Sequence, residues 1–139
     1  MRYLGLDLGS RTLGIAISDA RGIIASYYGT IRHLEDYDSL IPKIVSLVEE
    51  LQIEAIVLGF PKNMNNTIGP KGELSLQFQK KLEEHLSIPI YLQDERLTTV
   101  SAHKVLIEGG LRRDKRKKVV DSMAATIILQ SYLDKERKS

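Results

Sequence analysis

Residues 3–19 (YLGLDLGSRTLGIAISD) constrain the fold most, because apolar and small residues alternate on both sides of a glycine-rich turn. Successive side chains of a β-strand point to opposite faces, so two such runs predict a hairpin with one apolar face and one nearly bare face. Asp7 belongs to the bare face and stands between Gly5 and Gly9. The hairpin therefore leaves open space around a single carboxylate.

Asp7 has two interpretations at this point. Strand interiors are poor in aspartate, and a carboxylate among glycines needs a partner or a metal, which favours a functional site that admits a large ligand. Alternatively, the small residues allow a helix to pack closely, and Asp7 only caps a loop. Residues 3–19 alone leave both open.

The remaining elements follow from periodicity. A third extended run over residues 23–31 completes an antiparallel meander, and the continuous apolar run 55–60 predicts a strand buried on both faces. Residues 88–95 predict the last strand. Helices are expected over residues 40–51, from Pro70 onward, from Thr98 or Thr99 to the glycines at 109–110, and over residues 119–137. The inner stripe expected for the closing helix consists of Val120, Met123, Ala124, Ile127 and Ser131.

This order of elements predicts an α/β domain spanning residues 1–139. Its mixed five-stranded sheet, flanked by helices, should have strands 1–3 antiparallel and strands 1, 4 and 5 parallel. The ribonuclease H-like fold is the leading fold of this kind. The chain has no cysteine, which excludes disulfides and thiolate metal sites and favours a reducing cytoplasm. No apolar run approaches the ~20 residues that span a bilayer, so we expect a soluble cytoplasmic protein without a membrane partner.

Charge is concentrated in residues 111–118 (LRRDKRKK). Six basic residues and one acid give this segment +5, so the rest of a chain of net charge +2 carries −3. Such a cluster predicts contacts with the phosphates of a nucleic acid, although a solvated loop explains it equally well. The candidate phosphate-binding residues are Arg112, Arg113, Lys115, Arg116, Lys117 and Lys118.

Three carboxylates could converge on one face of the sheet: Asp7, Glu95 at the end of the last strand, and Asp121 in the first turn of the closing helix. If the last strand is regular, Glu95 lies on the polar face and Asp94 on the core side; an irregular strand would exchange them. Asp121 alone is explained as well by the helix dipole. Together, three acids need a hard cation, and Mg²⁺ or Mn²⁺ at this triad would support hydrolysis of phosphodiester bonds. The three histidines (His33, His85 and His103) are expected at the surface.

The polar loop after the fourth strand, residues 61–69, is the usual place for a ligand, because it follows the carboxyl end of a parallel strand. Its asparagines, Asn63 among them, could bind a sugar or phosphate or could only shape the turn.

Four motifs, LDLGSRTLGIAISD, VLGFPKNMNNTIGP, DERLTT and VVDSMAA, resemble in order and spacing the YqgF/RuvX family of pre-ribosomal-RNA nucleases and Holliday-junction-resolvase homologues. The resemblance covers nearly the whole chain. It implies a bacterial cytoplasmic protein of ribonuclease H-like fold that matures the precursor of small-subunit ribosomal RNA. It also implies that Asp7, Glu95 and Asp121 are the catalytic and metal-binding acids and that Arg11 binds a phosphate. Arg96 in DERLTT is a further candidate for substrate binding.

The junction resolvases to which this family is similar carry their second acid after the preceding strand, where this chain has Val57 to Phe60 and no carboxylate. Their closing helix carries a second acid three residues after its first, where this chain has Ala124. Resolution of four-way DNA junctions is therefore the alternative activity, and a monomer and a homodimer both remain open. Two other classes compete. A sugar-kinase-like nucleotide binder would need a second lobe, for which 139 residues leave no room, whereas a non-catalytic nucleic-acid-binding assembly factor would not depend on the acids.

Overall fold

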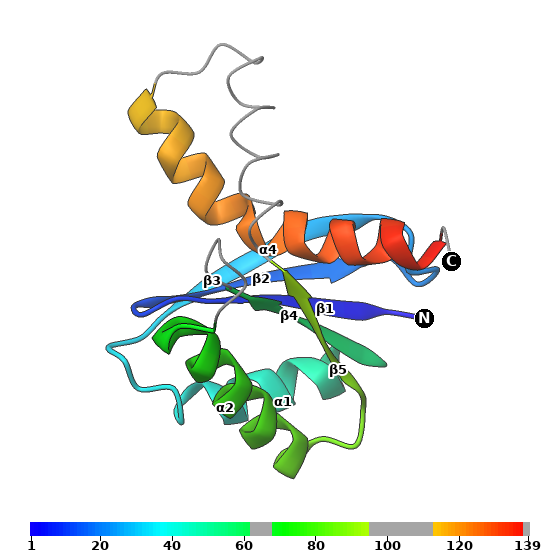
Figure 1. Ribbon diagram of the computed structural model, residues 1–139. Helices are drawn as coiled ribbons and strands as arrows, with labels where there is room; N and C mark the ends of the chain where they lie inside the picture. The colour runs from blue at the N-terminus through cyan, green and yellow to red at the C-terminus, as the bar shows by residue number, and fades with distance from the viewer. Residues whose placement is uncertain (62–67, 95–112, 138–139) are drawn as a thin grey trace.

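The computed structural model describes residues 1–61, 68–94 and 113–137, with the side chains of the last helix described from residue 123 to residue 136. These ranges contain five strands and three helices, which form one sheet with helices on both faces (Figure 1). They are β1 (Tyr3–Leu8), β2 (Thr12–Ser18), β3 (Ala25–Arg32), α1 (Leu40–Glu50), β4 (Ala55–Phe60), α2 (Pro70–His85), β5 (Ile90–Asp94) and α4 (Arg113–Arg137). The helix expected after Thr98 or Thr99 lies outside the described residues.

The sheet has the order β3-β2-β1-β4-β5. β1 pairs antiparallel with β2, and β2 pairs antiparallel with β3, whereas β4 runs parallel to both β1 and β5. This is the predicted mixed sheet. α1 and α2 cover one face and α4 covers the other, so the sheet is the middle of three layers (Figure 1).

Alternation along the strands divides the core between the two faces. Leu4 and Leu6 of β1 are fully buried toward α1 and α2, where Ile44, Phe78 and Leu82 meet them. Every residue of β4 is buried, as a strand between two helical layers requires.

α4 differs from the prediction in its start and in its buried face. It begins at Arg113, not at residue 119, because the Arg- and Lys-rich segment consists of good helix formers. Asp121 therefore lies in the third turn, not the first. The predicted inner stripe is wrong by one position: the residues buried against the sheet are Ala125, Ile128, Leu129, Tyr132 and Leu133.

Both sides of α4 carry apolar residues, so periodicity alone did not identify the buried side. The sheet determines which side of α4 is buried, because its bare face fits only a helix side that can approach closely. A Cβ added at Gly5 would lie 2.7 Å from Leu129 Cβ and 3.1 Å from the Ala125 carbonyl oxygen. Figure 1 shows the carboxyl-terminal part of α4 lying along the sheet, while its first turns lead away from it. Within the described ranges, no helix combines the length and apolarity needed to cross a bilayer.

Candidate active site

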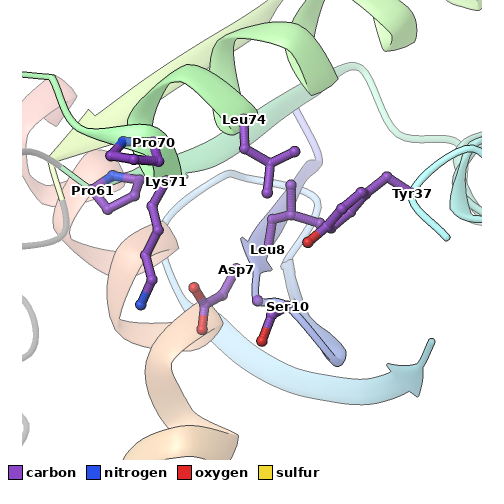
Figure 2. Close-up of a pocket in the computed structure, with 9 residues that line it drawn as sticks. Asp7, Leu8, Ser10, Tyr37, Pro61, Pro70, Lys71 and Leu74 are labelled. Atoms are coloured by element: carbon purple, nitrogen blue, oxygen red, sulfur yellow. The ribbon is translucent and has the colours of Figure 1, made fainter. Parts of the chain in front are cut away.

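A cavity of about 360 Å³ opens at the carboxyl end of β1. The end of β1 and the turn after it form one side, and the start of α2 forms the other (Figure 2). The lining residues are Asp7, Leu8, Gly9, Ser10, Tyr37, Pro61, Pro70, Lys71 and Leu74. The cavity thus lies at the carboxyl end of a parallel strand, a usual place for a ligand, and Pro61, the first residue of the loop after β4, lines it.

Asp7 projects from the α4 face of β1 toward the cavity (Figure 2). Its cross-strand partner is Gly14, where an added Cβ would lie 3.6 Å from Asp7 Cβ and 3.5 Å from Ala125 Cβ. No side chain therefore stands beside the carboxylate on the neighbouring strand. Among the described residues, we find neither a hydrogen bond nor an ion pair that the Asp7 carboxylate makes. The bare face therefore agrees with part of each interpretation. Gly5 lets a helix pack closely, and Asp7 lines a cavity.

Hydrogen bonds with His33 stabilise the turn between β1 and β2. The backbone N–H of His33 donates to the Arg11 carbonyl (2.8 Å), and its Nε2 lies 3.0 Å from the Gly9 carbonyl oxygen. A carbonyl oxygen only accepts, so Nε2 is the donor in this hydrogen bond, whereas Nδ1 is buried and has no hydrogen-bond partner among the described residues. The prediction of a surface histidine is wrong here, because His33 is only 7% exposed, whereas His85 is exposed as expected. Arg11 is exposed in this turn and does not line the cavity.

Lys71 is a cavity residue that the sequence analysis missed. It is the second residue of α2, and its side chain extends into the cavity toward Asp7 (Figure 2). One signal could have identified it: a cation in the first turn of a helix opposes the helix dipole, so it often has another role.

The structure describes the three predicted acids to different extents. Glu95 lies outside the described residues, and Asp121 is placed in α4 without a described side chain. The described part of β5 follows the expected parity, since Ile90 joins the α1 and α2 core and Tyr91 stacks on Tyr132 of α4. Among the described residues, no group of three or more histidines, aspartates and glutamates could hold a metal ion.

The position of α4 bears on Asp121. Leu129 packs at Gly5, and Ala125 reaches Gly14, so the helix runs antiparallel to β1. The turn before Ala125, which contains Asp121, therefore comes at the Asp7 end of the hairpin.

Besides Arg11, the predicted substrate-binding residues fall into two groups. Asn63, Arg96 and Arg112 lie outside the described residues. The other five belong to the first turns of α4, so this part of the basic segment is helical and not a loop; they are Arg113, Lys115, Arg116, Lys117 and Lys118.

Comparison with known proteins identifies the family. A chain from Bacillus subtilis strain 168 named "Putative pre-16S rRNA nuclease" is 52% identical over 135 residues, which cover 96% of this chain and 98% of that one. A Clostridium botulinum chain of the same name is 49% identical over 138 residues, covering 99% and 100% of the two chains.

Solved structures show the same fold at low sequence identity. Thermus thermophilus RuvC in complex with a Holliday junction substrate superposes with a TM-score of 0.63 at 14% identity, covering 100% of this chain and 97% of that one. The fowlpox virus Holliday junction resolvase gives a TM-score of 0.57 at 12% identity, covering 97% and 99%. These matches confirm the ribonuclease H-like fold. The RuvX family, described as Holliday junction resolvase, matches residues 1–135, and the chain belongs to this family.

Proposed function

We propose that this protein is a divalent-metal-dependent nuclease that hydrolyses phosphodiester bonds in the precursor of small-subunit ribosomal RNA, in the cytoplasm. The observation that carries the proposal is the Asp7 carboxylate, which enters a cavity at the carboxyl end of β1 in a chain of the RuvX family. The name shared by relatives about 50% identical supports the choice of ribosomal RNA as substrate.

The residues present fit a hard divalent cation. Asp7 offers carboxylate oxygens that no described side chain occupies, and Mg²⁺ and Mn²⁺ prefer such ligands. Asp7, Glu95 and Asp121 would hold the ion. When bound, it would activate a water molecule and stabilise the charge on the leaving oxygen.

The remaining predicted residues would bind the nucleic-acid substrate. Arg11 stands in the exposed turn next to Ser10, so its guanidinium can contact a phosphate close to the one that is cleaved. The basic start of α4, together with Arg112, Asn63 and Arg96, would hold phosphates and sugars farther along. Phosphate contacts of this kind position the substrate without reading its sequence.

Resolution of four-way DNA junctions is the second candidate, favoured by the description of the family and by the shared fold of RuvC. Symmetrical cleavage of a junction would require a homodimer. Cleavage of ribosomal RNA precursor places no such requirement on the oligomeric state.

The test is a cleavage assay with labelled ribosomal RNA precursor, a four-way DNA junction and ATP, each with Mg²⁺, Mn²⁺ or EDTA. We expect metal-dependent cleavage of the RNA that falls by at least about 100-fold in Asp7→Asn, because the variant loses a charged metal ligand. Asp38→Asn is the matched control, since Asp38 is an exposed aspartate paired with Lys81 outside the cavity. Preferential cutting of the junction would select the second candidate. Binding of RNA without cleavage by any variant would leave a non-catalytic assembly factor.

A further inference from the structure

The cavity beside Asp7 has two walls of different chemistry. Asp7, Ser10 and Lys71 bring polar groups to one side, and the side chains of Tyr37 and Leu74 form the other with Leu8 (Figure 2). A site with one charged side and one apolar side suits a ligand that is itself divided in this way. A nucleotide, with its anionic phosphate and flat base, is such a ligand.

Lys71 supplies the positive charge on the polar side. A lysine in the first turn of a helix is disfavoured, because the amino-terminal end of the helix dipole is also positive. Although Figure 2 shows its ammonium directed toward Asp7, the ion pairs found among the described residues do not join the two groups. A cation and a carboxylate that share a cavity without pairing leave room for a third group between them. Lys71 together with the helix amino terminus favours an anion there, and phosphate fits.

Tyr37 provides the aromatic part of the apolar side. It packs against the core, and its ring lies tilted on the buried His33, with centroids 5.1 Å apart. This leaves a fixed aromatic surface for the cavity, and bases stack on such surfaces regardless of sequence. At about 360 Å³, the cavity is near the lower end of the ~300–1,000 Å³ typical of small-ligand sites. That size is sufficient for one nucleotide.

We propose that this cavity receives one unpaired nucleotide next to the scissile phosphate, with its phosphate on Lys71 and its base against Tyr37 and Leu74. The inference rests on the proposed nuclease function and adds a substrate class to it. A base can enter only if it is not stacked in a duplex, so the site selects single-stranded or unpaired segments.

The test measures binding in EDTA, where no metal-dependent cleavage occurs. The probes are a fluorescent single-stranded RNA and a fully paired duplex of the same sequence. Lys71→Gln should weaken binding of the single strand roughly tenfold and reduce the dependence of log K on log salt by ~0.7, as loss of one phosphate contact predicts. Lys80→Gln is the matched control, because Lys80 is an exposed lysine of the same helix outside the cavity.

Tyr37 provides an independent readout. Tyr37→Leu should weaken binding of the single strand roughly tenfold and diminish the stacking signal of a 2-aminopurine base placed next to the cleavage site, whereas Tyr37→Phe should restore both. Neither Lys71→Gln nor Tyr37→Leu should change the affinity for the duplex by as much. Both variants should also raise KM for cleavage more than they lower kcat.

The outcomes separate this inference from the proposed function. If the wild-type protein cleaves RNA with metal, but Lys71→Gln and Tyr37→Leu bind the single strand like the wild type, the nucleotide site is wrong and the nuclease stands. If the duplex loses as much affinity as the single strand, selection for unpaired nucleotides is wrong. If the wild type binds single strands through Lys71 and Tyr37 but never cleaves, the nucleotide site stands and the nuclease is wrong. A protein that neither binds nor cleaves overturns both.

Discussion

Gly5 lies in the middle of β1 and packs directly against α4, so even a single methyl group at this position would clash with the helix. An added Cβ would lie 2.7 Å from Leu129 Cβ, closer than side-chain atoms approach one another. Leu129 Cβ is not the flexible end of a long side chain, so α4 or β1 would have to shift. Gly29 of β3 is the opposite case, since no atom of the described residues lies within 4 Å of an added Cβ.

We therefore expect Gly5→Ala to lower the free energy of unfolding by about 1–3 kcal/mol through overpacking. Gly29→Ala is the control, and because alanine restricts the unfolded chain more than glycine does, it should be neutral or slightly stabilising. Urea unfolding of both variants measures the difference. Equal stability of Gly5→Ala and Gly29→Ala would mean that α4 does not pack on β1 this closely.

Three tyrosines join α4 to two strands at the far end of the sheet. Tyr132 of α4 stacks on Tyr91 of β5 with ring centroids 5.3 Å apart, and its ring centroid lies 5.9 Å from that of Tyr3 of β1. Burial raises the pKa of Tyr132 to about 12, and the negative charge of Glu136 adds to this effect. The neutral phenol is thus favoured in the folded protein.

The sign of the pH dependence follows from this shift. Between about pH 10 and about pH 12 the unfolded chain loses the Tyr132 proton while the folded protein retains it, so ionisation favours unfolding. The wild type should lose about 1–2 kcal/mol more stability than Tyr132→Phe over this range, since one pKa unit corresponds to ~1.4 kcal/mol. Urea unfolding at several pH values tests this. Tyr28→Phe, at a position 45% exposed on β3, should follow the wild type, and the same slope in all three proteins would contradict the expectation.

For the molecule as a whole, strand type and order were predictable because alternation and continuous apolar runs report directly on burial. The hairpin, the fully buried β4 and the parallel pairing of β5 all follow from such patterns. The face of α4 was not predictable in this way, because the sequence offers apolar residues on both sides. Only the pairing of Ala125 and Leu129 with the glycines of the hairpin decides between them.

The candidate site was predictable where chemistry is unusual for its position, and not where geometry decides. Asp7 stood out as an acid among glycines in a strand, and it lines the cavity. Lys71 gave only a weak signal, a cation in the first turn of a helix, because its place in the cavity depends on where α2 begins relative to the end of β1. His33 was misjudged for a related reason: the fold, and not the neighbouring sequence, encloses it beneath the turn.

The uneven distribution of charge over the molecule leads to a prediction about nucleic-acid binding. The chain carries only +2, yet residues 111–118 carry +5, and all but the first two of these residues lie in the first turns of α4. Replacing Lys117 and Lys118 by glutamate should weaken binding of nucleic acids about equally across sequences and reduce the salt dependence of log K by ~1.4 for single strands, because two phosphate contacts are lost.

The matched control for this charge reversal replaces Lys43 and Lys80, exposed lysines of α1 and α2, by glutamate. Both double variants change the net charge by the same amount, so a general electrostatic attraction would weaken binding equally in the two. A local phosphate-binding surface would instead reduce affinity mainly in the Lys117 and Lys118 variant. Fluorescence anisotropy at two or more salt concentrations distinguishes these cases, and equal losses would show that the start of α4 is only a solvated helix.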